Sequence, residues 1–146
     1  MHEKWAYFMP ELVVRPQKIK VFGRPEGGYF TGSKFSMGEN SYVNRRCLVD
    51  CAHEAVEIGN NVGIAYNVSI YTTNHNMQNP NKRTGDVIGQ PVKINDGAWI
   101  GANAVICPGV TIGKGCVIAA GSVVTHSCED NSIYGGNPAR KIRNLN

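Results

Sequence analysis

Aliphatic residues recur at every sixth position over much of the chain. The register comprises Ile58, Ile64, Ile70, Ile94, Ile100, Ile106, Ile112, Ile118 and Val124. The residue four positions further on is again compact, as at Val62, Ala98 and Cys116. A helix would repeat its apolar positions about every 3.6 residues and a simple strand about every two. The period therefore indicates one short strand and one corner per repeat.

Three such repeats close a triangular coil, and stacked coils pair as parallel strands around a ladder of aliphatic side chains. Positions i and i+4 point inward across a corner, because strand positions two apart share a face. A small residue at i+1, such as Gly101 or Gly113, lets the chain turn without a Cβ clash. We therefore predict an all-β fold, a parallel β-helix of hexapeptide repeats, in preference to an antiparallel barrel.

We expect a single domain over residues 1–146. Within it we expect an N-terminal cap at 1–20, β-helix coils over 20–133 and a basic C-terminal segment at 134–146. The early coils are less regular, because Met37, Val43 and Val49 lie three residues out of step with Ile58. Their partners at i+4 are Ser41, Cys47 and His53. The cap would cover the open end, since an exposed strand edge promotes aggregation.

The repeat stops over about residues 71–91 and resumes at Ile94 in the same register. The interrupting segment is rich in Asn, Pro, Gly and Thr, which is typical of loops. A loop that leaves a regular solenoid and returns in phase is usually functional. We therefore predict an extruded loop, with His75 near its start.

Composition excludes several other classes of protein. The formal net charge of +4 is small and dispersed, so nucleic acid is not an expected partner. No apolar run is long enough to span a membrane, and the first residues lack the apolar core of a signal peptide, so we expect a cytoplasmic protein. The five cysteines have no zinc-site spacing, and we expect reduced thiols and no metal.

A series of motifs then identifies a family. The chain contains NRRCLVD at 44–50, IYTTNH at 70–75, AWIG at 98–101, PGVTIG at 108–113, AGSVVT at 120–125 and GNPAR at 136–140. In this order they resemble the hexapeptide-repeat acetyltransferases, specifically the maltose, galactoside and capsular-polysaccharide sugar O-acetyltransferases. The resemblance covers about residues 35–143. It implies a left-handed coil, an exception to the usual right-handed crossover. It also implies a homotrimer with sites between subunits, and acetyl-CoA as co-substrate.

The resemblance places His75 at the family's catalytic histidine. Acyl transfer from a thioester to a hydroxyl needs a base, and imidazole titrates near neutrality. The implied reaction moves an acetyl group from acetyl-CoA to a hydroxyl of a sugar or polysaccharide precursor. Attack would be direct, because the sequence contains no nucleophile elbow or Cys–His pair. Without the resemblance, an exposed loop histidine would be the simpler interpretation.

The resemblance also implies substrate binding by Asn44, Asp50 and Trp99. Residue chemistry alone would equally allow Asn44 as a turn residue and Asp50 as a corner acid. Trp99 follows an inward position, so it should point outward, which favours an interface or ligand groove over the core. His53 lies close in sequence to the same pocket, but the resemblance gives it no role.

The implied acetyl-CoA contacts follow the repeats. The backbone at Ala102, Ala120 and Thr125 would run along the pantetheine. Arg140 and Arg143 would lie near the nucleotide phosphates, since guanidinium groups suit phosphate oxygens. The alternative for these arginines is a solvated basic tail.

Other activities remain open at this level. Many relatives carry Lys where this chain has His126, so the resemblance assigns no acetyl-CoA contact to His126. An N-acetyltransferase acting on an amino-sugar nucleotide or an amine would use the same base. A non-catalytic β-helix scaffold is a third alternative. A zinc carbonic anhydrase needs three converging histidines, which the spacing of the four histidines does not suggest.

Overall fold

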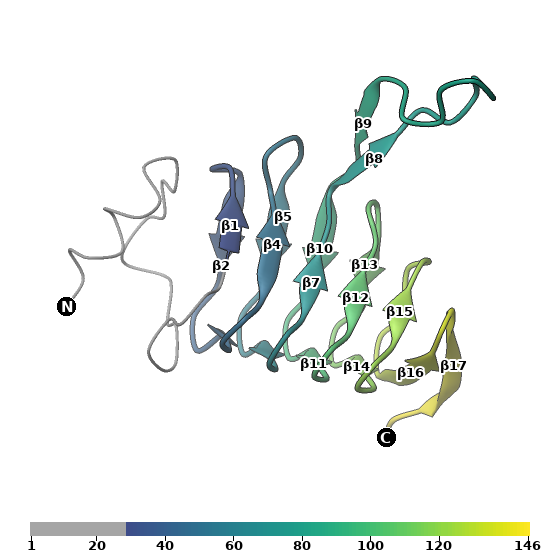
Figure 1. Cartoon of the computed structure of the whole chain (residues 1–146). Coiled ribbons are helices and arrows are strands. Elements are labelled where there is room, and N and C mark those ends of the chain that lie inside the picture. Colours follow the sequence, from purple (N-terminus) through teal and green to yellow (C-terminus); the bar gives the residue numbers. More distant parts are fainter. Residues whose placement is uncertain (1–28) are drawn as a thin grey trace.

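The computed structural model describes residues 29–146, whose strands wind into a prism with three faces (Figure 1). The N-terminal cap expected at 1–20 lies outside the described residues. The described residues contain no helix, and so none that could cross a membrane.

Among the described residues, each turn of the chain except the last contributes one strand to each face in succession. The first face consists of β1 (Tyr29–Thr31), β4 (Leu48–Asp50), β7 (Ser69–Ile70), β12 (Val105–Ile106) and β15 (Val123–Val124). The second face consists of β2 (Phe35–Met37), β5 (Val56–Ile58), β10 (Val92–Ile94) and β13 (Thr111–Ile112). The third face consists of β3 (Tyr42–Val43), β6 (Gly63–Ile64), β11 (Trp99–Ile100), β14 (Val117–Ile118), β16 (Ser132–Gly136) and β17 (Ala139–Asn144). Within these three faces, neighbouring strands are parallel except β16 and β17, which are antiparallel.

The six-residue register forms the core, as the sequence predicts. Ile58, Ile94 and Ile112 stack on the second face, and equivalent ladders run inside the other two. All nine aliphatic side chains of the register are at most 4% exposed. The compact i+4 residues are buried between the ladders, which explains why Ala98 and Ala104 are small. β-branched side chains suit these short strands, because their χ1 is stiff and they pack well on a pleated surface.

The corners turn through residues with positive φ. Among the described residues, six non-glycine residues have positive φ: five are asparagine, at 40, 61, 67, 103 and 131, and the sixth is Arg46. Asparagine and glycine adopt this conformation at low cost, so they allow the chain to change direction once per repeat.

The structure explains the register shift before Ile58. Val49 and Ile58 lie nine residues apart rather than six, because the corner between β4 and β5 holds three extra residues. The corner changes the i+4 pattern, so Cys51 is buried and His53 is exposed. The inward position expected for His53 is therefore wrong, whereas Met37, Val43 and Cys47 are buried as expected.

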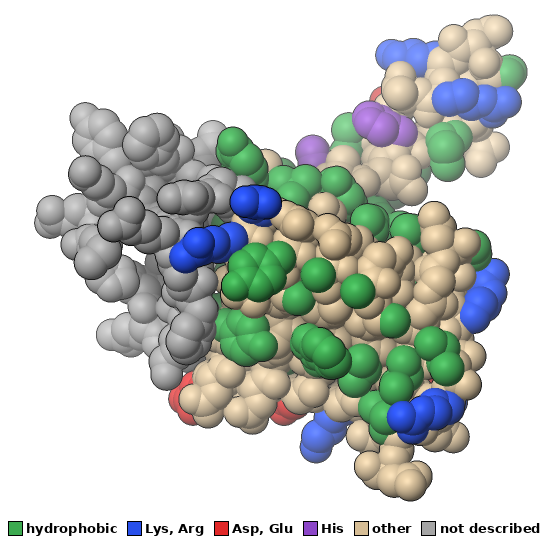
Figure 2. Space-filling view, turned by 60° about the horizontal axis from the view of Figure 1, so that its bottom comes forward, with side chains coloured by type: hydrophobic (Ala, Val, Ile, Leu, Met, Phe, Trp, Pro, Cys, Tyr) green, Lys and Arg blue, Asp and Glu red, His purple; other side chains and the backbone are tan. Residues whose placement is uncertain are grey.

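The outward positions differ between faces. On the second face they are polar, and the residues in register are Ser36, Glu57, Lys93 and Thr111. On the third face they are mostly apolar: Tyr42, Gly63, Trp99, Val117 and Ile133. Figure 2 shows apolar side chains spread over this part of the surface. The first face is intermediate, with Leu48, Ser69, Val105 and Val123 in register.

Candidate active site

The loop expected at 71–91 is an antiparallel hairpin that projects from the prism between the first and second faces (Figure 1). Its strands are β8 (Thr73–His75) and β9 (Val87–Gly89), with Thr73 opposite Gly89 and His75 opposite Val87. The ladder continues beyond His75, where the Asn76 amide donates to the Asp86 carbonyl at 2.8 Å. The segment returns to the prism at β10 in phase. The sequence located the excursion but did not reveal its two short strands, which lack an alternating apolar pattern.

His75 is half-buried on this hairpin, and a backbone group holds its ring. The imidazole Nδ1 lies 3.1 Å from the carbonyl oxygen of Gly85. A carbonyl only accepts hydrogen bonds, so Nδ1 carries the proton and the neutral ring presents Nε2 as an acceptor. This tautomer is the one that a general base needs if it is to take a proton at Nε2.

Asp50 ends β4 at the foot of the hairpin. Its Oδ1 accepts a hydrogen bond from the Thr31 hydroxyl at 2.9 Å, and its main-chain carbonyl accepts one from the buried Thr72 hydroxyl, also at 2.9 Å. Burial acts to raise the pKa of the Asp50 carboxyl, but hydroxyl and amide groups of Thr73, Thr31, Ala52 and Thr72 outweigh it and hold that pKa below its usual range. Asp50 is therefore an ionised carboxylate fixed beside the root of the hairpin.

Other predicted site residues lie elsewhere in the chain. Trp99 lies on the third face and is 55% exposed. Asn44 follows β3 at the corner between the third and first faces. Ala102 and Ala120 lie at the same corner, where the Gly121 amide donates to the Ala102 carbonyl at 2.8 Å. Within one chain, these residues occupy a different edge of the prism from the hairpin that carries His75.

Thr125 follows β15 at the corner from which the hairpin leaves. It lies two strands along the first face from β7, or roughly 10 Å at the usual strand spacing. Its hydroxyl lies 2.9 Å from Nδ1 of His126, and both residues are exposed. Thr125 therefore belongs to the same edge as His75, unlike the two alanines.

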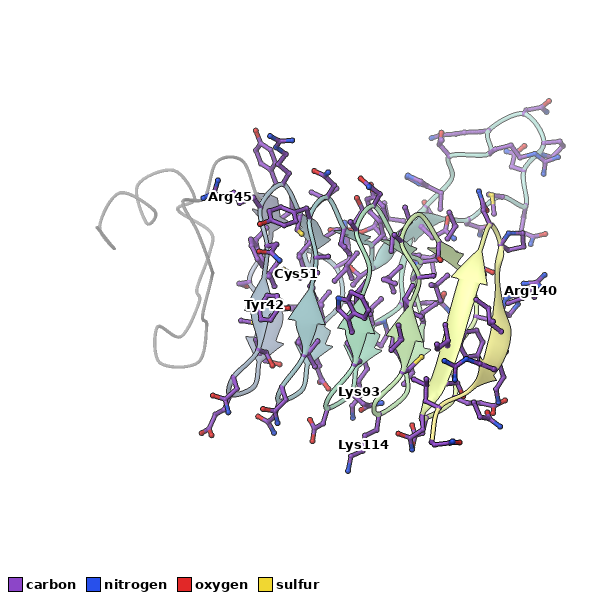
Figure 3. The ribbon with its side chains drawn as sticks, turned by 90° about the horizontal axis from the view of Figure 1, so that it is seen from below. Tyr42, Arg45, Cys51, Lys93, Lys114 and Arg140 are labelled. Carbon is purple, nitrogen blue, oxygen red and sulfur yellow. The ribbon has the colours of Figure 1, made fainter. Side chains whose placement is uncertain are left out.

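Arg140 and Arg143 lie on β17, and Figure 3 shows Arg140 at the end of the prism away from Tyr42. Within residues 29–146, each guanidinium donates only to a nearby main-chain carbonyl, at 3.0 Å for Arg140 and 3.2 Å for Arg143. Lys141, between them, instead pairs with Glu129 at 2.5 Å. Both arginines are exposed and have no acidic partner among the described residues, so their charge is available to an anionic ligand.

Two further features were not evident in the sequence. The Gly85 carbonyl that orients His75 is a main-chain group with no side-chain signature. The Thr72–Thr73 pair was visible only as part of a family motif, although both residues contact Asp50.

An open groove of about 550 Å³ crosses the second face beside Glu57, Lys93 and Lys114, but none of the predicted site residues lines it. Among residues 29–146, no group of three His, Cys, Asp or Glu side chains is arranged to hold a metal ion.

Residues 91–126 match the family described as bacterial transferase hexapeptide (six repeats). The chain is 41% identical over 120 residues to galactoside O-acetyltransferase of Escherichia coli (strain K12), covering 81% of this chain and 58% of that protein.

Two crystal structures are similar to this chain in both sequence and fold. A maltose O-acetyltransferase from Clostridium difficile 630 is 38% identical, with a TM-score of 0.80 over 89% of this chain and 68% of that one. A hexapeptide-repeat-containing acetyltransferase from Vibrio cholerae O1 biovar eltor, complexed with acetyl-coenzyme A, is 29% identical, with a TM-score of 0.83 over 99% of this chain and 78% of that one. These likenesses confirm the predicted fold class, a left-handed parallel β-helix of hexapeptide repeats.

Proposed function

Because the chain belongs to the hexapeptide-repeat acetyltransferases, we propose that it transfers an acetyl group from acetyl-CoA to a hydroxyl of a sugar or polysaccharide precursor. The observation that carries this proposal is the His75 imidazole, which Gly85 holds at 3.1 Å on a hairpin projecting from the prism. Relatives named for galactoside and maltose acetylation support a sugar as the acceptor.

In the proposed reaction, Nε2 of His75 takes the proton of the acceptor hydroxyl while its oxygen attacks the thioester carbonyl carbon. The tetrahedral intermediate then collapses, the carbon–sulfur bond breaks, and the imidazolium returns the proton to the CoA sulfur. The products are an acetyl ester and free CoA. The Gly85 carbonyl contributes by stabilising the imidazolium, because Nδ1–H remains a donor to it throughout the cycle.

Acetyl-CoA, the acetyl donor, is proposed to lie along the first face and its corners. Ala102, Ala120 and Thr125 would contact the pantetheine, chiefly through backbone groups. Arg140 and Arg143 would bind the phosphates, which suits guanidinium groups that have no acidic partner among the described residues. Acetyl-CoA enters as a co-substrate, and the chemistry requires no metal.

We propose that the complete site forms between copies of the chain in a homotrimer. Asp50 and His75 lie at one corner of the prism, whereas Asn44 and Trp99 lie on or beside the third face, so one chain does not bring them together. The exposed Trp99 and its apolar neighbours favour a covered third face. The charged second face would remain in solvent. A C3 arrangement would place the third face of one copy near the hairpin of the next.

A panel of acceptors tests the proposal. The purified protein is incubated with acetyl-CoA and galactosides, maltose, glucosides or amino sugars, and CoA release is followed with a thiol reagent. At least one neutral sugar should release CoA, and hydroxylamine should remove the acetyl group, as expected for an ester. A hydroxylamine-stable amide on an amino sugar would instead identify an N-acetyltransferase. The absence of CoA release with every acceptor would contradict the proposal.

A further inference from the structure

The corner between β4 and β5 packs against the root of the hairpin. Gly89, in β9, has no side chain, and the aliphatic part of Glu54 fills the vacant position. A Cβ built on Gly89 would lie 2.6 Å from Cγ of Glu54 and 3.3 Å from Cβ of His53. The three extra residues of this corner therefore bring a carboxylate to the hairpin, which a regular hexapeptide corner would be too short to do.

Glu54 and Asp50 lie on the hairpin face that carries His75. Side chains alternate along a strand, so Thr73 and His75 share a face with their cross-strand partners Gly89 and Val87. Asp50 interacts with the Thr73 hydroxyl, and Glu54 covers Gly89 directly opposite. His75 is two residues further along, at about 7 Å in an extended strand. Two carboxylates thus flank the approach to one imidazole.

The hydrogen bonding at this corner leaves acceptor groups available. Among the described residues, the Glu54 carboxylate has no hydrogen-bond or ion-pair partner. The nearby Lys34 ammonium donates to the His53 carbonyl at 2.6 Å rather than to either acid. The Thr73 Oγ1 is buried, and its hydroxyl interacts with the Asp50 carboxylate. Cationic side chains on the hairpin, Lys82 and Arg83, lie near its tip, where Arg83 donates to the Met77 carbonyl.

We propose that Glu54 is a specificity-determining residue of the acceptor site, selecting with Asp50 for sugars that are uncharged or carry an ammonium group close to the attacking hydroxyl. The inference rests on the proposed acetyl transfer and names its substrate class. A carboxylate accepts hydrogen bonds from sugar hydroxyls or an ammonium group, and it repels a carboxylate or phosphate placed nearby. The selection acts only within about 8 to 10 Å, because salt screens more distant charges. An anionic group elsewhere on a longer acceptor is therefore tolerated.

The test compares acceptors that differ only in charge. The neutral sugar with the highest rate in the panel is assayed beside its 2-amino and uronic acid analogues, with kcat/KM measured for each. Wild-type protein should prefer the neutral or amino sugar to the uronic acid by roughly tenfold or more, as expected for like charges a few ångströms apart near a protein surface. Glu54→Gln should reduce this ratio several-fold while leaving the KM for acetyl-CoA unchanged.

Two further variants separate specificity from folding. Glu57→Gln removes the same charge from the second face, three residues away on an outward position, and should leave the ratio unchanged. Gly89→Ala keeps the charge but places a methyl group where the Glu54 side chain lies. Gly89 does not have positive φ, so alanine is tolerated by the backbone, and the displaced carboxylate should reproduce the Glu54→Gln effect. Thermal unfolding of each variant reports on folding.

The outcomes are distinguishable. An unchanged charge preference in both Glu54→Gln and Gly89→Ala would overturn the role of Glu54. A wild-type protein that accepts the uronic acid as readily as the neutral sugar would also overturn it. The absence of CoA release with every acceptor would contradict the proposed acetyl transfer, and this inference with it.

Discussion

Replacing His75 with alanine should remove catalysis while leaving the fold and the donor site intact. The imidazole makes one described side-chain hydrogen bond, at 3.1 Å to Gly85. It lies on a hairpin whose strands pair only with each other. Loss of that bond costs about 0.5–1.5 kcal/mol, and it acts on the hairpin rather than on the aliphatic core. The free energy of unfolding of the prism should therefore change little.

The kinetic effect should be much larger. A positioned general base contributes roughly a hundred- to ten-thousand-fold to rate, which corresponds to about 3–5 kcal/mol in the activation barrier. His75→Ala should therefore lower kcat by that factor, while the affinity for acetyl-CoA, measured by calorimetry, stays within about twofold.

The matched control is His53→Ala, because His53 is an exposed histidine at the neighbouring corner and its imidazole makes no hydrogen bond to the described residues. It should retain near-normal turnover. A folded His75→Ala protein that binds acetyl-CoA and turns over at a near-normal rate would refute the base assignment. In that case, a large loss in His53→Ala or Asp50→Asn would identify the alternative base.

Three further predictions concern packing, the donor and assembly. Gly101→Ala should lower the free energy of unfolding by about 1–3 kcal/mol in denaturant titration, because its Cβ would lie 2.5 Å from a backbone nitrogen of the next coil; unchanged stability would contradict the close stacking of coils. Charge reversal at Arg140 and Arg143 should raise the KM for acetyl-CoA several-fold, and less at high salt, whereas Lys93→Glu on the second face should not; equal effects would mean that the arginines are only a solvated tail. Light scattering should give a particle near three times the 15.9 kDa chain mass, and Trp99→Glu should dissociate it while Lys93→Glu does not. A fully active monomer would rule out the trimer.

Much of the fold was determined by the sequence alone. The register from Ile58 to Val124 predicted which side chains are buried. In a narrow prism, an aliphatic side chain can avoid water only by pointing inward to the axis. The repeat stops at 71–91 and resumes in the same register, and this located the hairpin. The order of motifs indicated His75 and Asp50, and the structure places both at one corner.

Other features were decided only by tertiary structure. In the sequence, the three extra residues between Val49 and Ile58 appear only as a shift in the register of the six-residue repeat. The shift does not reveal that they pack against the hairpin of the next coil. The Gly85 carbonyl orients His75 through a main-chain atom, which no residue pattern encodes. The Glu54 side chain can pack against the hairpin because Gly89 has no side chain, and these two residues are distant in sequence. The repeat is a local property of the chain, whereas each of these contacts joins segments that only the stacking of coils brings together.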